Sequence, residues 1–352
     1  MSNDLTQELQ QQVASAYTEG KALSIRGSNS KTFLGNKCEA APLMVSEHSG
    51  IVSYEPVELV ITARAGTKLK EIEDTLAAEG QMLPFEPPYF GEDATLGGCI
   101  ACGLAGPSRP FAGSVRDYVL GVKLINGKAE VLRFGGQVMK NVAGYDCSRL
   151  MAGAMGTLGL MLEISLKVLP KPAQKLTLVK QLSVEKALNA MTRWSGKPYP
   201  LSAAAFDGEK LYMRLSGSET AVESSSKLIG GDRLDSNNSF WQQLKEHKLP
   251  FFDSNKSLWR LSIPATTPAL DLAGKTFIDW SGAQRWLISD EPADKIRDQV
   301  KKLDGHATLF RNNDNVTTFQ KPDAGLMEIH RRLKTSFDPK GIFNPGRLYS
   351  EI

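Results

Sequence analysis

Apolar and polar positions alternate most clearly in the segments that follow residue 117. "LMLEISLKVLP" places four apolar side chains, from Leu162 to Val168, on one face, which is the period of two typical of a β-strand. "YVLGVKLINGKAEVLRF" contains two further apolar runs separated by Asn126-Gly127, a dipeptide that favours a tight hairpin turn. The pattern therefore predicts three strands in this part of the chain.

The N-terminal third combines strands with one helix. "ALSIRG" is a short apolar run that ends at Arg26-Gly27, and "VELVITARAG" is a second strand-like run. Apolar positions at helical spacing predict a helix with Thr67 as its N-cap and Gly80 at its C-terminal end. The polar turn "SNSK" after the first run can present several backbone N–H groups to a pyrophosphate, although an ordinary surface turn has the same composition.

In the middle of the chain, about residues 173–305, segments with helical spacing of apolar residues alternate with strand-like segments. "VEKALNAMTRW" and "AVESSSKLIGG" have helical spacing, whereas "LWRLSIP" and "AQRWLISD" are strand-like. "AAAFDGEKLYMRLSG" predicts a hairpin with Asp207-Gly208 at its turn. This alternation predicts a compact α+β domain.

Composition and charge exclude several classes of protein. The 352 residues favour two domains, or one large domain with an insertion, and 41% hydrophobic residues suffice for a sizeable core. The net charge of +3 is too small to indicate nucleic acid or an acidic surface as a partner. No run approaches the roughly 18 apolar residues of a membrane span, and the N-terminus lacks the features of a signal peptide. Four cysteines are too few for a disulfide framework and fit a reducing cytosol.

Glycines are concentrated between residues 97 and 159, where 13 of the 31 lie. Apolar runs are interleaved with them, so the region is a folded domain with glycine-rich loops rather than a low-complexity linker. Because Gly permits positive φ and close approach of a ligand to the backbone, several such loops predict a long ligand such as a dinucleotide. A Rossmann fingerprint and a P-loop are both absent, since the chain contains no Gly-x-Gly and "GKT" at 274–276 lacks the required upstream glycine.

The order of these motifs resembles a known family. "RGSNS", "ARAGTKLKEIEDTLAAEGQMLPFEPP", "ATLGGCIACGLAGPSR", "GSVRDYVLGV", "KNVAGYD" and "GTLGLMLEISLKVLP" are similar to the FAD-binding domain of the vanillyl-alcohol-oxidase type. "LKTSFDPKGIFNPGRL" is similar to the closing segment of that family, the FAD-linked oxidases, which are related to D-lactate and D-2-hydroxyacid dehydrogenases. In detail the motifs resemble the FAD-binding subunits of bacterial glycolate oxidase (glycolate dehydrogenase). The likeness is strong over about residues 20–172 and 306–349.

This resemblance implies an α+β fold with three parts. Residues 1–172 would form a two-subdomain FAD-binding domain, residues 173–305 a smaller α+β cap domain, and residues 306–352 a C-terminal segment that packs back on the FAD domain and returns to the flavin. FAD would be bound non-covalently, because "RGSNS" offers Ser and Asn where covalent relatives commonly have His or Cys, and Cys38 lies beyond that loop.

The resemblance also implies a set of cofactor-binding residues, each with the alternative of being an ordinary turn residue or, for Asp117, a solvated helix cap. The set consists of Arg26, Gly27, Ser28, Asn29 and Ser30 around the pyrophosphate; Thr95, Gly97, Gly98 and Gly103 in a second phosphate loop; Ser114 and Asp117 near the ribityl chain and flavin; Gly156 and Leu160 in a turn at the adenine half; and Asn344 and Arg347 on the flavin side. Catalytic residues are not assigned.

The pair Cys99-x-x-Cys102 lies directly behind the second phosphate loop. Two small side chains suit a closely packed loop, and we favour this structural interpretation. A redox dithiol would need a thioredoxin-like βαβ context, and a metal site would need further ligands at suitable spacing. Cys38, Cys147 and the four histidines are scattered along the chain, so no metal site is predicted.

The cap region offers little catalytic chemistry. Arg260 and Arg285 could pair with a substrate carboxylate, or they could be ordinary surface or ion-pair arginines. His247 is the single histidine of this region, and no general base is evident. "HRRLK" at residues 330–334 is expected to be a solvated helix face. The predicted flavin site is therefore more complete than the predicted substrate site.

The resemblance implies the FAD-binding subunit of a complex that oxidises glycolate, and related 2-hydroxyacids such as D-lactate, to the 2-oxoacid, which is glyoxylate for glycolate. Electrons would pass to an acceptor other than NAD, and the implied partners are a paralogous FAD-binding subunit and an iron–sulfur subunit. The expected location is cytoplasmic, with any peripheral attachment to the inner membrane made through these partners. The alternatives are a free-standing FAD-dependent 2-hydroxyacid dehydrogenase and a non-catalytic FAD-binding scaffold.

Overall fold

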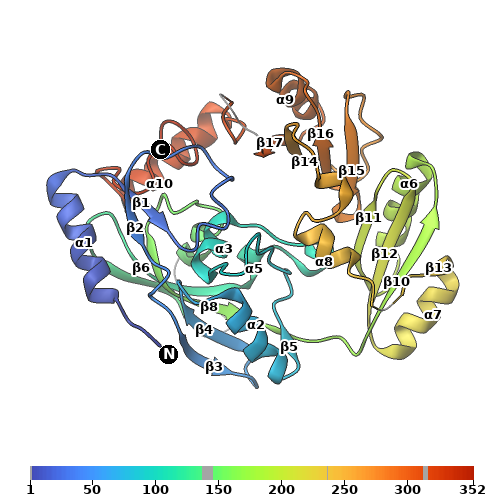
Figure 1. Cartoon of the computed structure of the whole chain (residues 1–352), viewed down its shortest axis with the longest axis horizontal. Coiled ribbons are helices and arrows are strands. Elements are labelled where there is room, and N and C mark those ends of the chain that lie inside the picture. The colour runs from blue at the N-terminus through green and yellow to red at the C-terminus, as the bar shows by residue number, and fades with distance from the viewer. Residues whose placement is uncertain (1, 137–145, 236, 312–315) are drawn as a thin grey trace. The chain divides into compact units, whose positions relative to one another are not determined.

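The computed structural model describes residues 2–136, 146–235, 237–311 and 316–352. They form two compact units, each with sheets of its own. Unit 1 comprises Met1–Leu104, Ser114–Pro170 and Lys321–Ile352, and unit 2 comprises Ala105–Gly113 and Lys171–Gln320. Figure 1 labels those elements of both units for which there is room.

A five-stranded antiparallel sheet is the largest sheet of unit 1, and its strand order is β3-β4-β8-β6-β7. β8 is central because its apolar side chains are buried on both faces, with only Glu163 and Lys167 partly exposed. The strands are β3 (Ile51–Glu55), β4 (Val60–Arg64), β6 (Val119–Ile125), β7 (Val131–Gly135) and β8 (Leu160–Lys167). The strands predicted from alternation in these segments are therefore confirmed.

The β6–β7 hairpin does not have the two-residue turn that Asn126-Gly127 predicted. Residues 126–130 connect the strands, and Oδ1 of Asn126 accepts hydrogen bonds from two backbone N–H groups within this loop, at 2.9 and 3.0 Å. Gly127 is required by a long-range contact, since a Cβ there would lie 2.4 Å from Oδ1 of Asp338. The prediction was wrong because the glycine permits close packing instead of forming a tight turn.

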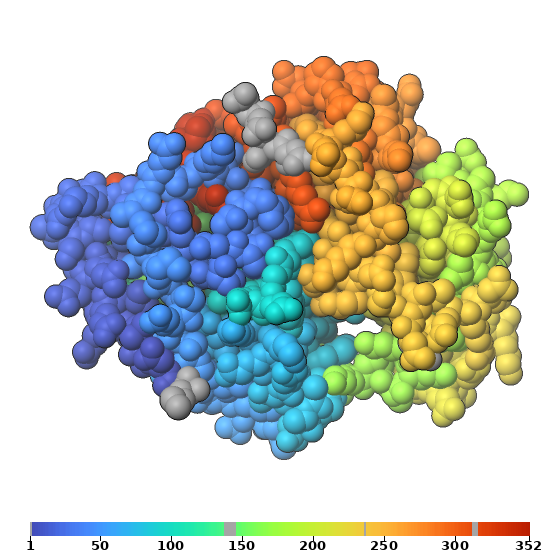
Figure 2. All heavy atoms as spheres, in the orientation of Figure 1, coloured from blue at the N-terminus to red at the C-terminus, as the bar shows by residue number. Residues whose placement is uncertain are grey.

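The N-terminal and C-terminal segments of unit 1 meet beside a second, smaller sheet. β1 (Leu23–Arg26) pairs in parallel with β2 (Ala41–Met44), and Leu23 also bridges to Phe343 near the C-terminus. In Figure 2 the red atoms of the C-terminal segment accordingly appear beside blue atoms of the N-terminal part. A further antiparallel pair consists of β5 (Gln81–Met82) and β9 (Leu169–Pro170).

The helix predicted after β4 is present, with one corrected end. α2 spans Leu69–Ala78 with Lys68 at the N-cap position, because Thr67 is used elsewhere: its Oγ1 accepts a hydrogen bond from the N–H of Gly50 at 2.9 Å. Gly80 follows the helix with φ +65°, as a C-terminal glycine should. The other helices of unit 1 are α1 (Thr6–Glu19), α3 (Leu96–Cys102), α5 (Val115–Tyr118), α10 (Ala324–Phe337) and the 3-10 helix η1 (Cys147–Met151).

Unit 2 contains an eight-stranded sheet with the order β13-β10-β12-β11-β15-β16-β14-β17. The strands are β10 (Gln174–Gln181), β11 (Leu201–Phe206), β12 (Lys210–Gly217), β13 (Asp232–Arg233), β14 (Leu258–Ser262), β15 (Lys275–Asp279), β16 (Gln284–Ile288) and β17 (His306–Arg311). The helices are α4 (Arg109–Ala112), α6 (Val184–Ser195), α7 (Glu219–Ile229), α8 (Phe240–Lys245), α9 (Ala293–Lys301) and the 3-10 helices η2 (Pro250–Phe252) and η3 (Trp280–Gly282). The hairpin predicted at Asp207-Gly208 is confirmed, since β11 and β12 pair antiparallel across it.

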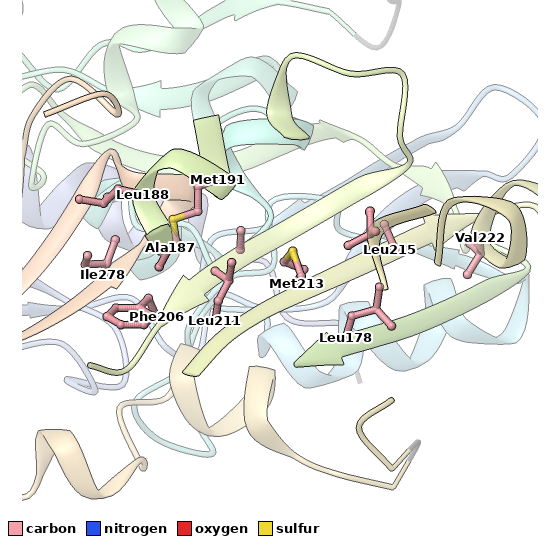
Figure 3. Close-up of a cluster of buried hydrophobic side chains, with 12 residues drawn as sticks. Leu178, Ala187, Leu188, Met191, Phe206, Leu211, Met213, Leu215, Val222 and Ile278 are labelled. Carbon is pink, nitrogen blue, oxygen red and sulfur yellow. The ribbon is translucent and has the colours of Figure 1, made fainter. Parts of the chain in front are cut away.

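Two hydrophobic clusters stabilise unit 2. In the first, α6 and α7 bury Leu188 and Val222 among strand residues such as Leu178 and Met213 (Figure 3). In the second, α9 packs against β14, β16 and β17. Each helix thus buries one apolar face against the sheet. The helical spacing predicted α6 and α7, whereas α9 was not predicted.

The division into units differs in detail from the domain boundaries expected from the sequence. β17 was expected in the C-terminal segment 306–352, but it belongs to unit 2, which extends to Gln320. The physical reason is that Ala307 and Leu309 on this strand are buried in the cluster beneath α9. Residues 105–113 also belong to unit 2.

Candidate functional site

A cleft of about 330 Å³ lies within unit 1. Its walls come from segments that are far apart in the sequence: the end of β1 with the loop behind it, residues 37–38, α3 with its N-cap, the turn 155–161, and the C-terminal residues Asn344 and Arg347, together with Val45 and Ala65. A cleft of this size and mixed lining is typical of a small-molecule or cofactor site.

The loop that follows β1 presents a row of unused backbone donors. In the described part of the chain, the backbone N–H groups of residues 27–31 form no hydrogen bond with the protein. Asn29 at the tip of the loop has φ +62°, a left-handed conformation that Asn tolerates better than most residues. Successive N–H groups in such a loop form a concave anion-binding surface.

Glycine is required where this loop meets the start of α3. A Cβ on Gly27 would lie 2.5 Å from Oγ1 of Thr95, so no other residue fits without movement. Gly97 is equally constrained, because a Cβ there would lie 2.8 Å from the Cβ of Ala65. Thr95 is the N-cap of α3, and its side chain accepts a hydrogen bond from the N–H of Gly98 at 3.3 Å. The second predicted phosphate loop is thus the start of helix α3, and its N-cap Thr95 lies directly beside Gly27 of the first loop.

The electrostatics of the cleft favour an anion. Arg26, Lys31, Lys37 and Arg347 all line it, and among the described lining residues there is no Asp, Glu or His. Lys31 is fixed in place, since its Nζ donates a hydrogen bond to the carbonyl oxygen of Tyr89 at 3.0 Å. Positive charge beside unpaired backbone donors is the arrangement that binds phosphate groups.

Asn344 and Arg347 shape the walls of the cleft through their side chains. Oδ1 of Asn344 accepts a hydrogen bond from the N–H of Ile25 at 2.7 Å, and its Nδ2 donates to the carbonyl oxygen of Met155 at 2.6 Å. Arg347 donates to the carbonyl oxygen of Asn36 at 2.9 Å. These contacts join the C-terminal segment to both the β1 loop and the 155–161 turn.

Most of the cofactor-binding residues predicted from the sequence line this one cleft, and three do not. The residues brought together are Arg26, Gly27, Ser28, Asn29, Ser30, Thr95, Gly97, Gly98, Gly156, Leu160, Asn344 and Arg347. Gly103 instead ends α3 with φ +64°. Ser114 and Asp117 form the capping box of α5, in which the N–H and the hydroxyl of Ser114 both donate to Oδ2 of Asp117 at 2.8 Å. Asp117 therefore caps α5, and its place near the flavin stays a prediction.

Sequence reasoning missed other parts of the lining. One signal was available: Gly98, Ala101 and Cys102 have helical spacing, so a helix starting at Leu96 places them on one face. Lys31 and Gly159 lie within the "SNSK" turn and the 156–160 turn that were recognised, but they were not singled out. The other missed residues come from separate segments, and no local pattern marks them; they are Ser24, Ile25, Thr32, Lys37, Cys38, Val45, Ala65, Met155 and Met161.

The cysteine pair has two different environments. Cys99 is buried in the core, which fits the predicted structural role, whereas Cys102 lines the cleft. Burial raises the pKa of the Cys102 thiol, and it also raises the pKa of Cys38, which lines the same cleft. Both thiols are therefore protonated near neutral pH. None of the four cysteines, all of which lie in the described part of the chain, forms a disulfide.

The remaining sequence motifs lie elsewhere. "KNVAGYD" falls, apart from Asp146, on residues 137–145, outside the described residues. The described residues contain no group of three or more His, Cys, Asp or Glu side chains placed to hold a metal ion. In the same part of the chain no helix combines the length and apolar character needed to cross a membrane.

The two arginines considered as carboxylate anchors differ sharply. Arg285 is only 1% exposed, and its guanidinium donates to the carbonyl oxygens of Gly282 at 2.9 Å and Thr267 at 2.8 Å. It therefore holds two loops, and the structure does not support a role as a carboxylate anchor.

Arg260, on β14, has different surroundings from Arg285. Its guanidinium lies 5.9 Å from the centre of the Phe310 ring, and no described residue places a carboxylate within salt-bridge distance of it. Desolvation and the charge of Arg109 lower the pKa of Arg260 to about 10, so it remains a cation at neutral pH.

His247 lies among aromatic side chains in unit 2. Its ring stacks on Phe252 at 4.0 Å and meets Trp286 edge to face at 4.4 Å. Arg311 can only donate, so the Nδ1 of His247, 3.1 Å from Nη2 of Arg311, is the acceptor. Desolvation and the two neighbouring arginines keep the pKa of His247 well below its ordinary value.

Comparison with known proteins identifies the family. Residues 4–135 match the family model described as "FAD binding domain". Over 349 residues the chain is 48% identical to glycolate oxidase subunit GlcE of Escherichia coli (strain K12), and the match covers 99% of each chain. The chain belongs to the family of glycolate oxidase subunit GlcE. The predicted resemblance is thereby confirmed, and the family is one of FAD-dependent oxidoreductases.

Other relatives match in part. Glycolate oxidase subunit GlcD of Bacillus subtilis (strain 168) is 31% identical over 157 residues, which is 44% of this chain and 33% of that protein. Among solved structures, an alkyldihydroxyacetonephosphate synthase superimposes with a TM-score of 0.70 at 16% identity, covering 97% of this chain and 76% of the other. That likeness shows the fold, and it confirms the predicted α+β fold of the vanillyl-alcohol-oxidase type.

FAD is the cofactor of this GlcE-family chain, as predicted. The cleft fits the group, because its unpaired N–H groups and cations suit a pyrophosphate and Gly27 lets the loop after β1 lie close to Thr95. Bound FAD supplies a two-electron acceptor that takes a hydride from a carbon bearing a hydroxyl group. The residues present therefore agree with the family assignment.

Proposed function

We propose that this chain is the FAD-binding subunit of a multi-subunit complex that oxidises glycolate, and related 2-hydroxyacids such as D-lactate, to the 2-oxoacid. In this reaction the C–H bond of the hydroxyl-bearing carbon breaks, its hydride leaves for the cofactor, and the hydroxyl proton goes to a base. One observation carries the proposal: the described lining of the cleft provides donors and cations for FAD but no Asp, Glu or His to serve as that base.

The role of the chain's own residues is then to bind and orient the cofactor. The backbone of residues 27–31 and the cations Arg26 and Lys31 would hold the pyrophosphate, while Gly27 lets this loop approach Thr95 at the start of α3. Gly97 lets α3 pack closely on Ala65. We propose that Gly156, Leu160, Asn344 and Arg347 form the opposite wall around the rest of FAD.

The partners that we propose are a paralogous FAD-binding subunit and an iron–sulfur subunit, which pass electrons to an acceptor other than NAD. The relative in Escherichia coli is named as a subunit of glycolate oxidase, which supports an assembly of this kind. A base supplied by a partner would contribute roughly 10²–10⁴-fold in rate, so its absence should be measurable. Any attachment to a membrane would be made by these partners.

A dye-linked assay tests the proposal directly. FAD-loaded chain alone is compared with the co-expressed complex at the same flavin concentration, with glycolate as substrate. We expect turnover by the complex and a rate lower by roughly 10²-fold or more for the chain alone. Comparable turnover in the two samples would favour a free-standing dehydrogenase. Flavin that stays oxidised within the assembled, glycolate-treated complex would favour a non-catalytic scaffold.

Arg260 favours the free-standing dehydrogenase as a second candidate. It is a cation beside an aromatic ring, without a carboxylate partner among the described residues, and a planar guanidinium suits bidentate binding of a carboxylate. If the chain turns over glycolate alone, Arg260→Gln should raise KM by roughly 10-fold or more. The matched variant Arg285→Gln should lower stability instead, because its partners are backbone carbonyls. An unchanged KM in Arg260→Gln would remove this candidate anchor.

A further inference from the structure

Lys334 departs from the pattern of its own helix. It lies in the "HRRLK" run of α10, which was expected to face solvent, yet the Lys334 residue is only 7% exposed while its neighbours Arg331 and Arg332 are exposed. Its Nζ donates three hydrogen bonds: to Oδ2 of Asp338 at 2.7 Å and to the carbonyl oxygens of Thr157 and Phe343, each at 2.8 Å. An ammonium group has three donors, so its capacity is fully used.

Asp338 completes a buried ion pair that closes the end of α10. Its side chain is fully buried, and its two oxygens accept hydrogen bonds from the N–H groups of Ile342 at 3.0 Å and Phe343 at 2.8 Å. Burial lowers the pKa of Lys334, while the Asp338 carboxylate opposes that effect. Burying two charges costs desolvation free energy, so a buried ion pair is weak evidence that the pair stabilises the fold. The Lys334–Asp338 pair therefore calls for another explanation.

The contacts of this pair lead to two walls of the cleft. Thr157, which binds Lys334 through its carbonyl, belongs to the same turn as Met155 and Gly156. Phe343, the other carbonyl partner, directly precedes Asn344, whose side chain joins Met155 to Ile25 at the end of β1. Lys334 itself does not line the cleft, but each of its two carbonyl partners lies within two residues of one that does.

The segments held in this way have strained backbones. Met155 has φ +53° and Asn344 has φ +42°, both in the left-handed region that residues other than glycine enter only at a cost. Gly156 has no room for a side chain, since a Cβ there would lie 2.6 Å from Nδ2 of Asn344. Conformations of this kind persist when their surroundings over-determine them, and Lys334 supplies one fixed point on each side.

We propose that Lys334 is a positioning residue for FAD: the Lys334–Asp338 pair fixes the 155–157 turn against the 343–344 segment, and so sets the width of the cofactor cleft. This inference rests on the assignment of FAD to that cleft. It gives the closing segment of the chain a function in cofactor binding that operates through backbone carbonyls rather than through contact with FAD.

Titration of the full-length apoprotein with FAD, followed by flavin fluorescence, tests this role. Lys334→Met should raise the Kd for FAD at least ~10-fold, because the turn and the C-terminal segment lose their common donor. The control Lys340→Met removes a charge from the same segment, where the exposed Lys340 donates only to the carbonyl oxygen of Tyr17 at 2.8 Å and makes a cation–π contact with that residue's ring. Its Kd should remain within about 2-fold of the wild-type value.

A double variant separates positioning from simple instability. Lys334→Met/Asp338→Asn leaves no unpaired buried charge, so its thermal stability should return close to that of the wild type. Positioning predicts that its Kd stays raised at least ~10-fold and that the visible circular dichroism of the bound flavin changes. A folded double variant with wild-type Kd and spectrum would overturn the inference. Failure of wild-type chain to bind FAD would overturn the cofactor assignment, and this inference with it.

Discussion

Gly27 decides how closely two loops of the cofactor cleft approach each other. A Cβ at this position would lie 2.5 Å from Oγ1 of Thr95. We therefore expect Gly27→Val to push the loop away from α3 and to abolish FAD binding. The flavin content of the purified variant, measured from its absorbance near ~450 nm, should fall to background. Gly98→Ala should be milder, because its Cβ would meet Thr95 Oγ1 at 3.2 Å within a helix.

The matched control for Gly27→Val is Gly325→Ala in α10. A Cβ there would approach Oδ1 of Asp323 at 3.4 Å, an ordinary contact, and Ala favours helix more than Gly does by roughly 0.5–1 kcal/mol. The control should keep its full flavin content. Normal flavin stoichiometry in a folded Gly27→Val variant would contradict the assignment of this loop to the cofactor.

Non-covalent attachment of FAD is also argued at the residue scale. The β1 loop carries Ser28, Asn29 and Ser30, none of which is a strong nucleophile, but the structure places Cys38 and Cys102 in the lining of the cleft, closer than the sequence suggested. Burial raises the pKa of both thiols, which disfavours the reactive thiolate. Acid precipitation should therefore release the yellow colour into the supernatant. Colour retained in the pellet would show a covalent link, and Cys38→Ser would then identify it.

At the scale of elements, α3 explains why its two cysteines should be replaceable. Cys99 and Cys102 lie one turn apart on this helix, and Cys99 faces the core whereas Cys102 faces the cleft. Because the two side chains occupy different environments, we expect that neither position requires a thiol. Cys99→Ala with Cys102→Ser should keep flavin content and complex activity, and should lower the free energy of unfolding by about 1 kcal/mol. Chemical denaturation and the dye-linked assay measure the two effects. Loss of activity at full FAD occupancy would support the redox alternative.

Elements built from local periodicity could be predicted from the sequence, and those decided by distant partners could not. The alternation from Leu162 to Val168 identified β8, because a half-buried or buried strand needs that pattern. Thr67 was assigned as a helix cap, but its hydroxyl binds Gly50, which lies seventeen residues earlier. Gly127 was assigned to a tight turn, but it packs on Asp338. In both cases the deciding contact comes from another part of the fold.

The candidate site shows the same division. Its glycines and the polar loop from Arg26 to Ser30 were recognisable because a motif carries them along the chain. Lys334 was not, since one buried lysine within "HRRLK" has the same residue type as a solvated one. Asp338 lies only four residues along the chain, but the other two acceptors, the carbonyl oxygens of Thr157 and Phe343, come from segments outside the helix, which no local pattern reveals. Sequence reasoning therefore found the cofactor-facing loops and missed the residues that support them.

Across the whole molecule, the histidines make stability depend on pH. Desolvation lowers the pKa of His48, His247, His306 and His330 below the ordinary value. A histidine whose pKa is lower in the folded state stabilises the protein fully above its unfolded pKa of ~6.5, and that contribution is lost as the pH falls. Between pH 7.5 and 5.5 carboxylates change little, so histidines should dominate the loss.

His48 is the sharpest test of this behaviour. It is fully buried, and its Nδ1 accepts a hydrogen bond from the N–H of Leu5 at 3.0 Å. Burial is the largest cause that lowers the pKa of His48, and the positive charge of Arg64 lowers it further. The negative charges of Asp4 and Glu163 raise the pKa, but they do not reverse the direction. His48→Asn should be less stable at pH 7.5 but lose less stability on acidification, by up to ~1.4 kcal/mol per pH unit. Urea unfolding at several pH values measures this difference. Ile72→Val, a buried apolar control, should keep the wild-type slope. An unchanged slope in His48→Asn would show that His48 does not contribute to the pH dependence.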